Sequence, residues 1–231
     1  MKTSNKIFFS FLIFLLGGIT ALYVGSKYYV EYYDTHNFVE QVKPLPPFSV
    51  VVAEPGAQIQ LRNDSKTKIA QSFFKTAQPK FAPFVVRNDT LFVFGVKLDR
   101  NKLPRAQFMV NVYCEKVKHF VAKERSVVYL SGYQVDSIFV NINNADLACQ
   151  NNNSVYIRMK AKNSRTNFDC GKLNSMEVEL DKTRMELKSK NRINNISGTV
   201  KNDSDVVLSQ NGKVNLDVDK SSNLTMYDSQ N

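Results

Sequence analysis

The chain has 231 residues, of which 43% are hydrophobic and 11% aromatic, and its formal net charge is +10. This composition excludes wholesale disorder, and the length allows one large β domain or two small ones. Three cysteines without a CxxC spacing and two histidines are too few for a zinc site or a disulfide-stapled scaffold. We therefore expect no metal and no cofactor.

Residues 7–24 read IFFSFLIFLLGGITALYV and contain no charged side chain. A helix of this length spans roughly 27 Å, close to the hydrocarbon core of a bilayer. Lys2 and Lys6 precede the run, which favours an amino terminus on the cytoplasmic side. We predict a single-pass inner-membrane anchor over residues 1–33, with the lipid bilayer as partner of residues 7–24. The alternative is a cleaved signal peptide and a secreted domain.

Residues 34–47 are predicted to form a short tether between the anchor and the domain. Pro44, Pro46 and Pro47 would stop a helix and stiffen the chain here. The domain itself is predicted over residues 48–231, outside the cytoplasm and facing the periplasm or the exterior.

The domain reads as strands throughout. Apolar residues alternate with other residues in Gln58-Ile-Gln-Leu and Leu91-Phe-Val-Phe, and turn formers such as Glu54-Pro-Gly separate these runs. No stretch of helical period is evident after residue 48. The fold class is therefore all-β.

The second half of the domain repeats. Five apolar segments begin 17, 21, 20 and 18 residues apart, and a second short apolar pair follows each of them. The segments are Ile138-Val140-Ile142, Val155-Ile157-Met159, Met176-Val178-Leu180, Ile196-Gly198-Val200 and Val214-Leu216-Val218. A period near twenty with two strands per repeat predicts a single-stranded parallel β-solenoid (a β-helix). An antiparallel sandwich is the alternative.

The alignment predicts which residues share a column along the stack. One outer column would run Arg158, Glu179, Thr199 and Asp217, and its neighbour would run Lys160, Asp181, Lys201 and Asp219. Opposite charges on adjacent rungs would favour this register. The same alignment places Cys149 and Cys170 in equivalent positions, either as stacked core thiols or as a disulfide, and leaves Cys114 alone.

The chain resembles the bacterial auto-transporter adhesin head GIN domain family of Bacteroidetes. The resemblance covers about residues 48–226, and rests on three features: Phe48-Ser-Val-Val-Val with Gly56-Ala-Gln-Ile-Gln-Leu, Arg87-Asn-Asp-Thr-Leu-Phe-Val, and late rungs such as Gly212-Lys-Val-Asn-Leu-Asp-Val. The chain departs from the family in being poorer in glycine and richer in Lys and Phe. The resemblance implies an envelope-associated β-solenoid with an adhesive or scaffolding role and no catalytic residues.

The positive charge is concentrated in the first half of the domain, where residues 97–125 alone carry +5. We predict this basic half as the contact surface for an anionic glycan or envelope polymer, and the alternative is a solvated face without a partner. Nucleic acid is not expected outside the cytoplasm. The residues concerned are Lys97, Arg100, Lys102, Arg105, Lys116, Lys118, Lys123 and Arg125.

No GxSxG, HExxH, P-loop or dinucleotide motif occurs. His119 follows Cys114 by five residues, but a surface histidine is the simpler interpretation. Glu177, Glu179 and Asp181 alternate along one strand and could supply the paired carboxyls of a glycosidase. We predict a membrane-anchored structural, adhesive or ligand-presenting module of the cell envelope without catalysis; the alternative is a carbohydrate-active enzyme using the Glu177–Asp181 strand.

Overall fold

The computed structural model describes residues 3–74, 81–96, 109–150, 153–170, 172–189, 193–209 and 212–227. The chain divides into two compact units, one with the amino-terminal helix and the other with most of the strands. The elements are α1 (Thr3–Asn37), β1 (Phe38–Pro44), β2 (Val50–Ala53), β3 (Gln58–Arg62), β4 (Lys68–Phe74), β5 (Phe84–Arg87), β6 (Thr90–Val93), β7 (Met109–Tyr113), β8 (His119–Ala122), β9 (Val127–Ser131), β10 (Gln134–Asn143), β11 (Asp146–Gln150), β12 (Asn153–Lys162), β13 (Arg165–Cys170), β14 (Lys172–Asp181), β15 (Arg184–Ser189), β16 (Asn195–Lys201), β17 (Asp205–Ser209), β18 (Lys213–Val218) and β19 (Asn223–Tyr227).

Helix α1 contains one stretch, Phe8–Tyr29, that is long and apolar enough to cross a membrane. Its 22 residues would extend about 33 Å along a helix axis. Such a stretch near the amino terminus is typical both of an anchor and of a signal sequence. The structure differs from the predicted tether over residues 34–47, because the helix continues to Asn37 and Phe38–Pro44 forms β1.

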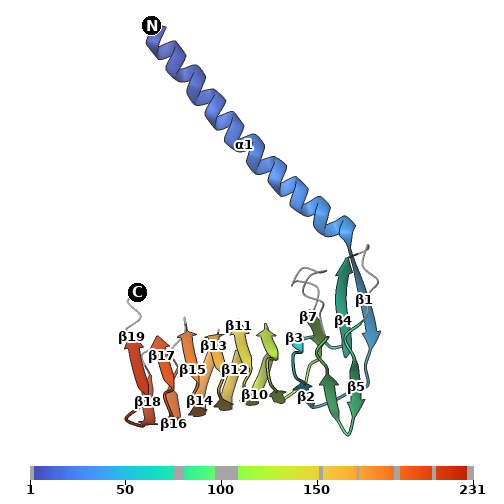
Figure 1. The fold of residues 1–231 in the computed structure, drawn as a ribbon, viewed down its shortest axis with the longest axis vertical. Coiled ribbons are helices and arrows are strands. Elements are labelled where there is room, and N and C mark those ends of the chain that lie inside the picture. The colour runs from blue at the N-terminus through green and yellow to red at the C-terminus, as the bar shows by residue number, and fades with distance from the viewer. Residues whose placement is uncertain are drawn as a thin grey trace. The chain divides into compact units, whose positions relative to one another are not determined.

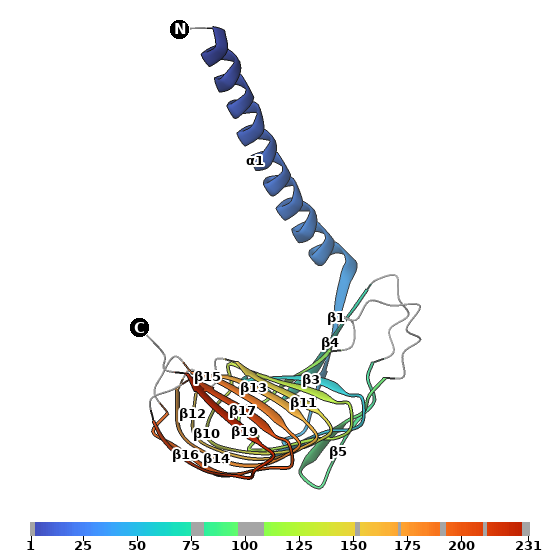
Figure 2. The ribbon, with the colours of Figure 1, turned by 60° about the vertical axis from the view of Figure 1, so that its left-hand side comes forward.

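The strands form two sheets that together make a β-solenoid, as the repeat predicts (Figure 1). Sheet A has ten strands in the order β1-β4-β7-β3-β9-β11-β13-β15-β17-β19, and sheet B has nine in the order β18-β16-β14-β12-β10-β8-β2-β6-β5. From β8 onward each coil adds one strand to sheet B and the next strand to sheet A, all in parallel register. Figure 2 shows the two layers of strands that face each other across each flattened coil.

The stack does not follow chain order at its amino-terminal end. Strands β2 and β3 lie between the later pair β6 and β7 and the pair β8 and β9. The end of the stack is then covered by β4, antiparallel to β7, and by β5, antiparallel to β6. These outer strands shield the apolar residues of the first coils, so that Leu91, Val93 and Val112 are each fully buried.

The core lies between the sheets, because alternate residues of each strand point inward. In sheet B one inward column runs through Ile138, Ile157, Met176 and Ile196, all at most 1% exposed. Parallel in-register stacking brings identical positions of neighbouring coils together, so each apolar column is a continuous strip of the core.

The predicted register is confirmed for the last three coils and is wrong by two residues for the coil formed by β12 and β13. Ile138 pairs with Ile157 and not with Val155, which is 55% exposed. In β13, Thr166 takes the inward position that the sequence assigns to an apolar residue, and it is 1% exposed. The alignment assumed that every inward position is apolar and that every aligned apolar residue points inward. The exposed Val155 and the buried Thr166 both depart from that assumption.

The corner between each sheet B strand and the next sheet A strand supplies the correct register. A residue with positive φ stands at Arg125, Asn144, Asn163 and Lys182, at intervals of 19 residues. Three of these corners continue with a buried serine or threonine, and in two of them the hydroxyl, of Ser164 or Thr183, donates to a nearby backbone carbonyl. This arrangement satisfies backbone groups at a sharp, partly buried bend.

We expect Thr166→Val to raise the free energy of unfolding by about 1 kcal/mol. The buried Thr166 hydroxyl has no hydrogen-bond partner among the described residues, so valine removes a polar group that gains nothing from burial. Thr183→Val is the matched control. Thr183 is equally buried, but its hydroxyl donates to the Asp181 carbonyl at 2.9 Å, and its loss should cost about 1 kcal/mol. Urea unfolding followed by circular dichroism measures both, and equal effects of the two changes would contradict the assignment.

Candidate functional site

The outer face of sheet B changes character along the stack. The same column of outward positions runs from His119 through Phe139 to Arg158 and Glu177. Its neighbour runs from Val121 through Asn141 to Lys160 and then to an acidic residue of β14. The earlier strands thus present aromatic and aliphatic groups, and the later strands present charged ones.

His119, Phe139 and Tyr156 form what we call the aromatic cluster. The imidazole of His119 stacks on the Phe139 ring with centroids 4.9 Å apart and an interplanar angle of 12°, and Tyr156 meets Phe139 edge-on at 6.3 Å. The histidine is exposed and the two other rings are half-buried. Aromatic rings on an open sheet face offer a flat apolar surface for a ligand, with no cost of opening a pocket.

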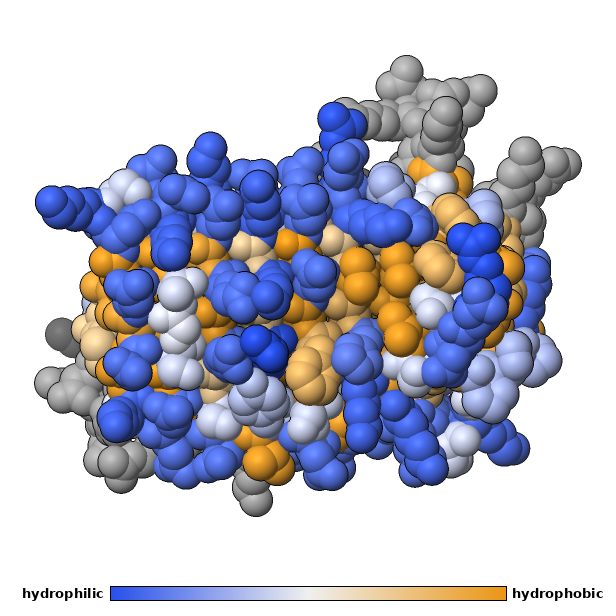
Figure 3. All heavy atoms as spheres, turned by 90° about the horizontal axis from the view of Figure 1, so that it is seen from below, coloured by the Kyte–Doolittle hydropathy of each residue, from blue (hydrophilic) through white to orange (hydrophobic). Residues whose placement is uncertain are grey.

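Two cations border the aromatic cluster. Arg158 stands next to Phe139 in its column, and Lys160 stands next to Asn141. These residues line a shallow hollow of about 390 Å³ together with His119 and Phe139. A second hollow of about 380 Å³ continues from it over β14 and β16 and shares Asn141 and Lys160. In Figure 3, apolar surface is visible in the middle of one face, between polar margins.

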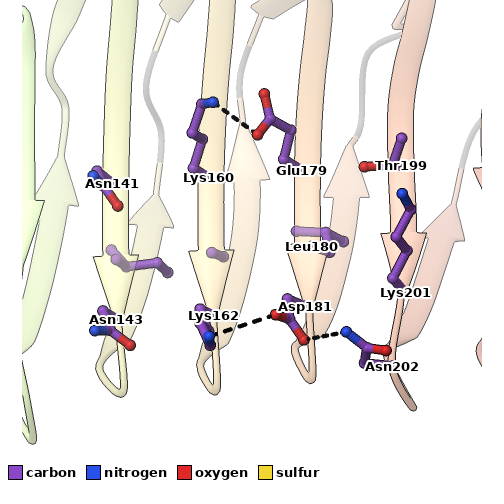
Figure 4. A pocket seen from close by; sticks show the side chains of 12 residues that line it. Asn141, Asn143, Lys160, Lys162, Glu179, Leu180, Asp181, Thr199, Lys201 and Asn202 are labelled. Carbon is purple, nitrogen blue, oxygen red and sulfur yellow. Dashed lines mark hydrogen bonds and ion pairs between the residues drawn. The ribbon is translucent and has the colours of Figure 1, made fainter.

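The second hollow is floored by a ladder of ion pairs (Figure 4). Lys160 Nζ lies 2.8 Å from Glu179 Oε2, and Lys162 Nζ lies 3.8 Å from Asp181 Oδ2. The predicted columns are therefore wrong by two residues on β12: Lys160 pairs with Glu179, and Lys162 takes the place next to Asp181. The alternation of charge persists in the corrected column, which continues to Lys201. Each exposed pair contributes under about 1 kcal/mol, so the ladder favours the register more than it stabilises the fold.

Glu177, Glu179 and Asp181, the carboxylates of the alternative enzyme, all lie on this open face. Arg158 approaches Glu177 at 3.3 Å and Glu179 at 3.9 Å, and the Tyr156 hydroxyl donates to Glu177 at 2.6 Å. This hydrogen bond raises the pKa of Tyr156. A general acid of a glycosidase requires an environment that keeps a carboxyl protonated, such as an apolar pocket. Here the three carboxylates lie instead on an open face, within 4 Å of Arg158, Lys160 or Lys162.

The predicted basic residues are only partly within the described chain. Lys97, Arg100, Lys102 and Arg105 lie outside the described residues. Of the others, Lys116 and Lys118 precede β8, whereas Lys123 and Arg125 follow it, and Lys123 is paired with Glu54 at 2.8 Å. These four residues thus flank one short strand, and their contact with an anionic ligand stays a prediction.

The predicted alignment of Cys149 with Cys170 is wrong by two residues. Cys149 lies opposite Phe168 in the ladder, and Cys170 lies opposite Ser189. Cys149 is fully buried and occupies an inward column. The Cys170 side chain lies outside the described residues, so the disulfide alternative stays a prediction.

Cys114 and His119 are not brought together. The Cys114 thiol is buried and contacts the Tyr133 hydroxyl at 4.0 Å, whereas His119 stacks on Phe139 on the outer face. Burial raises the pKa of Cys114 to about 12, which leaves the thiol protonated at neutral pH. Burial likewise raises the pKa of Tyr133, whose hydroxyl donates to the Val117 carbonyl at 2.8 Å. These groups belong to the core.

Within the described ranges, no group of three His, Cys, Asp or Glu side chains could hold a metal ion. The sequence did not single out the aromatic cluster as a candidate site. The available signal was Ile138-Phe139-Val140, in which an apolar ring occupies an outward position of an alternating strand.

Comparisons with known proteins bear on the fold. No family model matches the chain, and no curated protein matches it. A putative adhesin of Bacteroides fragilis NCTC 9343 superposes with a TM-score of 0.56 at 10% identity, over 82% of this chain and 95% of that one. A putative lipid binding protein of Parabacteroides distasonis ATCC 8503 gives 0.45 at 7% identity, over 83% and 97% of the two chains. The chain therefore has the adhesin-like β-solenoid fold of the Bacteroides fragilis protein, which confirms, at the level of the fold, the resemblance drawn from its sequence.

Proposed function

We propose that the chain is a membrane-anchored, non-catalytic binding module of the cell envelope. Helix α1 anchors it, and the solenoid faces away from the cytoplasm. The outer face of sheet B, from the aromatic cluster to Arg158 and Lys160, binds an acidic polysaccharide. The observation that carries this proposal is the stacked His119–Phe139 pair beside two exposed cations on an open sheet.

The chemistry of the face fits a uronic acid polymer. The apolar faces of sugar rings pack on exposed aromatic rings, while carboxylates pair with arginine and lysine. The side chains of Arg158 and Lys160 are 44% and 54% exposed, so they can reach a ligand although each also contacts Glu179. A guanidinium has five donors and can serve a protein and a ligand carboxylate together.

The test uses spheroplasts that display the full chain, with labelled polygalacturonate as the probe and neutral dextran as the comparison. We expect polygalacturonate to bind in a salt-sensitive manner and dextran to bind much more weakly. Phe139→Ala and Arg158→Ala should each weaken binding about tenfold or more. The first change removes the ring on which a sugar packs, and the second removes a cation that pairs with a ligand carboxylate. Lys188→Ala on sheet A removes a cation that is 62% exposed and should leave binding unchanged.

Glu179→Gln separates the module from the alternative enzyme. In the module, this change removes a carboxylate that competes for Arg158 and Lys160, so polygalacturonate should bind more tightly. In an enzyme of the Glu177–Asp181 strand, the same change would abolish the release of shortened product. Equal binding by the wild type and the Phe139→Ala variant would overturn the proposal, provided that an antibody against a carboxy-terminal tag labels both kinds of spheroplast.

A further inference from the structure

The two ends of the solenoid are not finished in the same way. At one end, the antiparallel strands β4 and β5 cover the first coils. At the other end, the last coil within the described residues consists of the parallel strands β18 and β19 (Figure 1), which, like β1 and β5, pair on one side only within the described sheets. An uncovered pair of edges exposes backbone donors and acceptors to any strand that can pair with them.

The inward apolar residues of this last coil are also more exposed to solvent than those of the earlier coils. In the column that passes through Cys149, the residues Phe168, Leu187 and Leu208 are 0% exposed, but Met226 in the last coil is 51% exposed. The inward residues of β18 behave in the same way. Val214, Leu216 and Val218 are half-buried, whereas Val200, one rung earlier, is fully buried. The end of the core is thus a hydrophobic surface bordered by two free strand edges.

We infer that this end binds a second copy of the chain, in a closed dimer in which β18 pairs antiparallel with β18 and β19 with β19. A two-fold axis perpendicular to the sheets generates both pairings at once and continues both sheets across the interface. Because both copies use the same surface, the contact closes at two copies and does not extend into a fibre.

The charges of β18 fit this self-pairing. When the antiparallel pair is centred on Asn215, Lys213 of each copy lies opposite Asp217 of the other, and Val214 lies opposite Leu216. On the outer face of the sheet, opposite charges therefore lie next to each other. On the inner face, the apolar residues of the two copies meet. On β19, centring on Thr225 places Leu224 opposite the exposed Met226 and adds no like-charge contact.

Cysteine cross-linking of the full chain in detergent tests the arrangement. Asn215→Cys places a thiol at the two-fold axis, and mild oxidation should convert most of the chain to a cross-linked dimer. Ser197→Cys is the matched control, because Ser197 occupies the same outer column one coil earlier and would be separated from its copy by two strands. The wild-type chain, treated in parallel, reports on the native cysteines. A folded Asn215→Cys variant without dimer, or equal cross-linking at both positions, would overturn the inference.

Charge exchange tests the register. In the Asn215→Cys background, Lys213→Asp or Asp217→Lys alone places like charges opposite each other twice per dimer and should reduce the cross-linked fraction about tenfold. The double change Lys213→Asp with Asp217→Lys should restore it. Thermal unfolding of each variant shows whether the coil is still folded. If the double variant of a folded chain behaves like the single ones, this register is excluded and the inference fails.

Discussion

Replacing Gly198 with alanine is expected to lower the free energy of unfolding by about 3 kcal/mol or more. Gly198 adopts φ +136°, a conformation that residues with a Cβ atom rarely adopt, and a Cβ atom built there would lie 1.8 Å from the Val178 carbonyl oxygen. That oxygen belongs to the neighbouring strand β14 and cannot move without breaking the ladder. Both the strain and the clash therefore act on the folded state.

Gly132→Ala provides the control. Gly132 also has positive φ, +65°, but a Cβ atom there would meet nothing within 4 Å. Its replacement introduces backbone strain without a clash and should cost only about 1 kcal/mol. Urea unfolding of the full chain in detergent, followed by circular dichroism of the strands, measures both variants. A Gly198→Ala variant as stable as Gly132→Ala would contradict the close approach of β14 and β16.

Phe168→Ala is expected to cost about 3–5 kcal/mol. Phe168 is fully buried in β13, and its ladder partners Cys149 and Leu187 are fully buried as well. The side chain is held between coils on both sides, so the structure can close the resulting cavity only in part. The loss should appear as a lower urea midpoint with an unchanged slope.

Val155→Ala is the comparison within the same coil. The structure leaves Val155 55% exposed at the start of β12, so its truncation should change stability by under about 0.5 kcal/mol. The register predicted from the sequence would place Val155 in the core and predicts a much larger loss. A cost above about 2 kcal/mol for Val155→Ala would therefore favour the sequence register over the structural one.

The sequence was informative about the repeat because a parallel stack places the same residue types at the same height in every coil. Met176, Ile196 and Val214 therefore align correctly from their spacing alone. The alignment failed at β12 and β13, where Thr166 is buried and Val155 is exposed. The positive-φ corners at Asn144, Asn163, Lys182 and Asn202 have the same spacing as the inward residues of sheet B, and a sharp bend restricts the backbone, so the corners indicate the correct register.

The amino-terminal coils could not be ordered from the sequence. Their strands are short and alternate well, but strand β2 pairs with β6 and β8, which are distant along the chain. A hydrophobic pattern states which face of a strand is buried and not which strand lies beside it. The antiparallel covering strands β4 and β5, and hence the difference between the covered and the open end, follow only from these long-range pairings.

The sequence by itself determined an apolar amino-terminal segment, an all-β class and a coiled repeat, because these depend on local composition and on the period of apolar residues. Only the tertiary structure decided which outward residues meet. His119 and Phe139 are 20 residues apart in the chain and become neighbours because β8 and β10 pair in register. Side-chain neighbours across strands depend on register, and register depends on the packing of the whole stack.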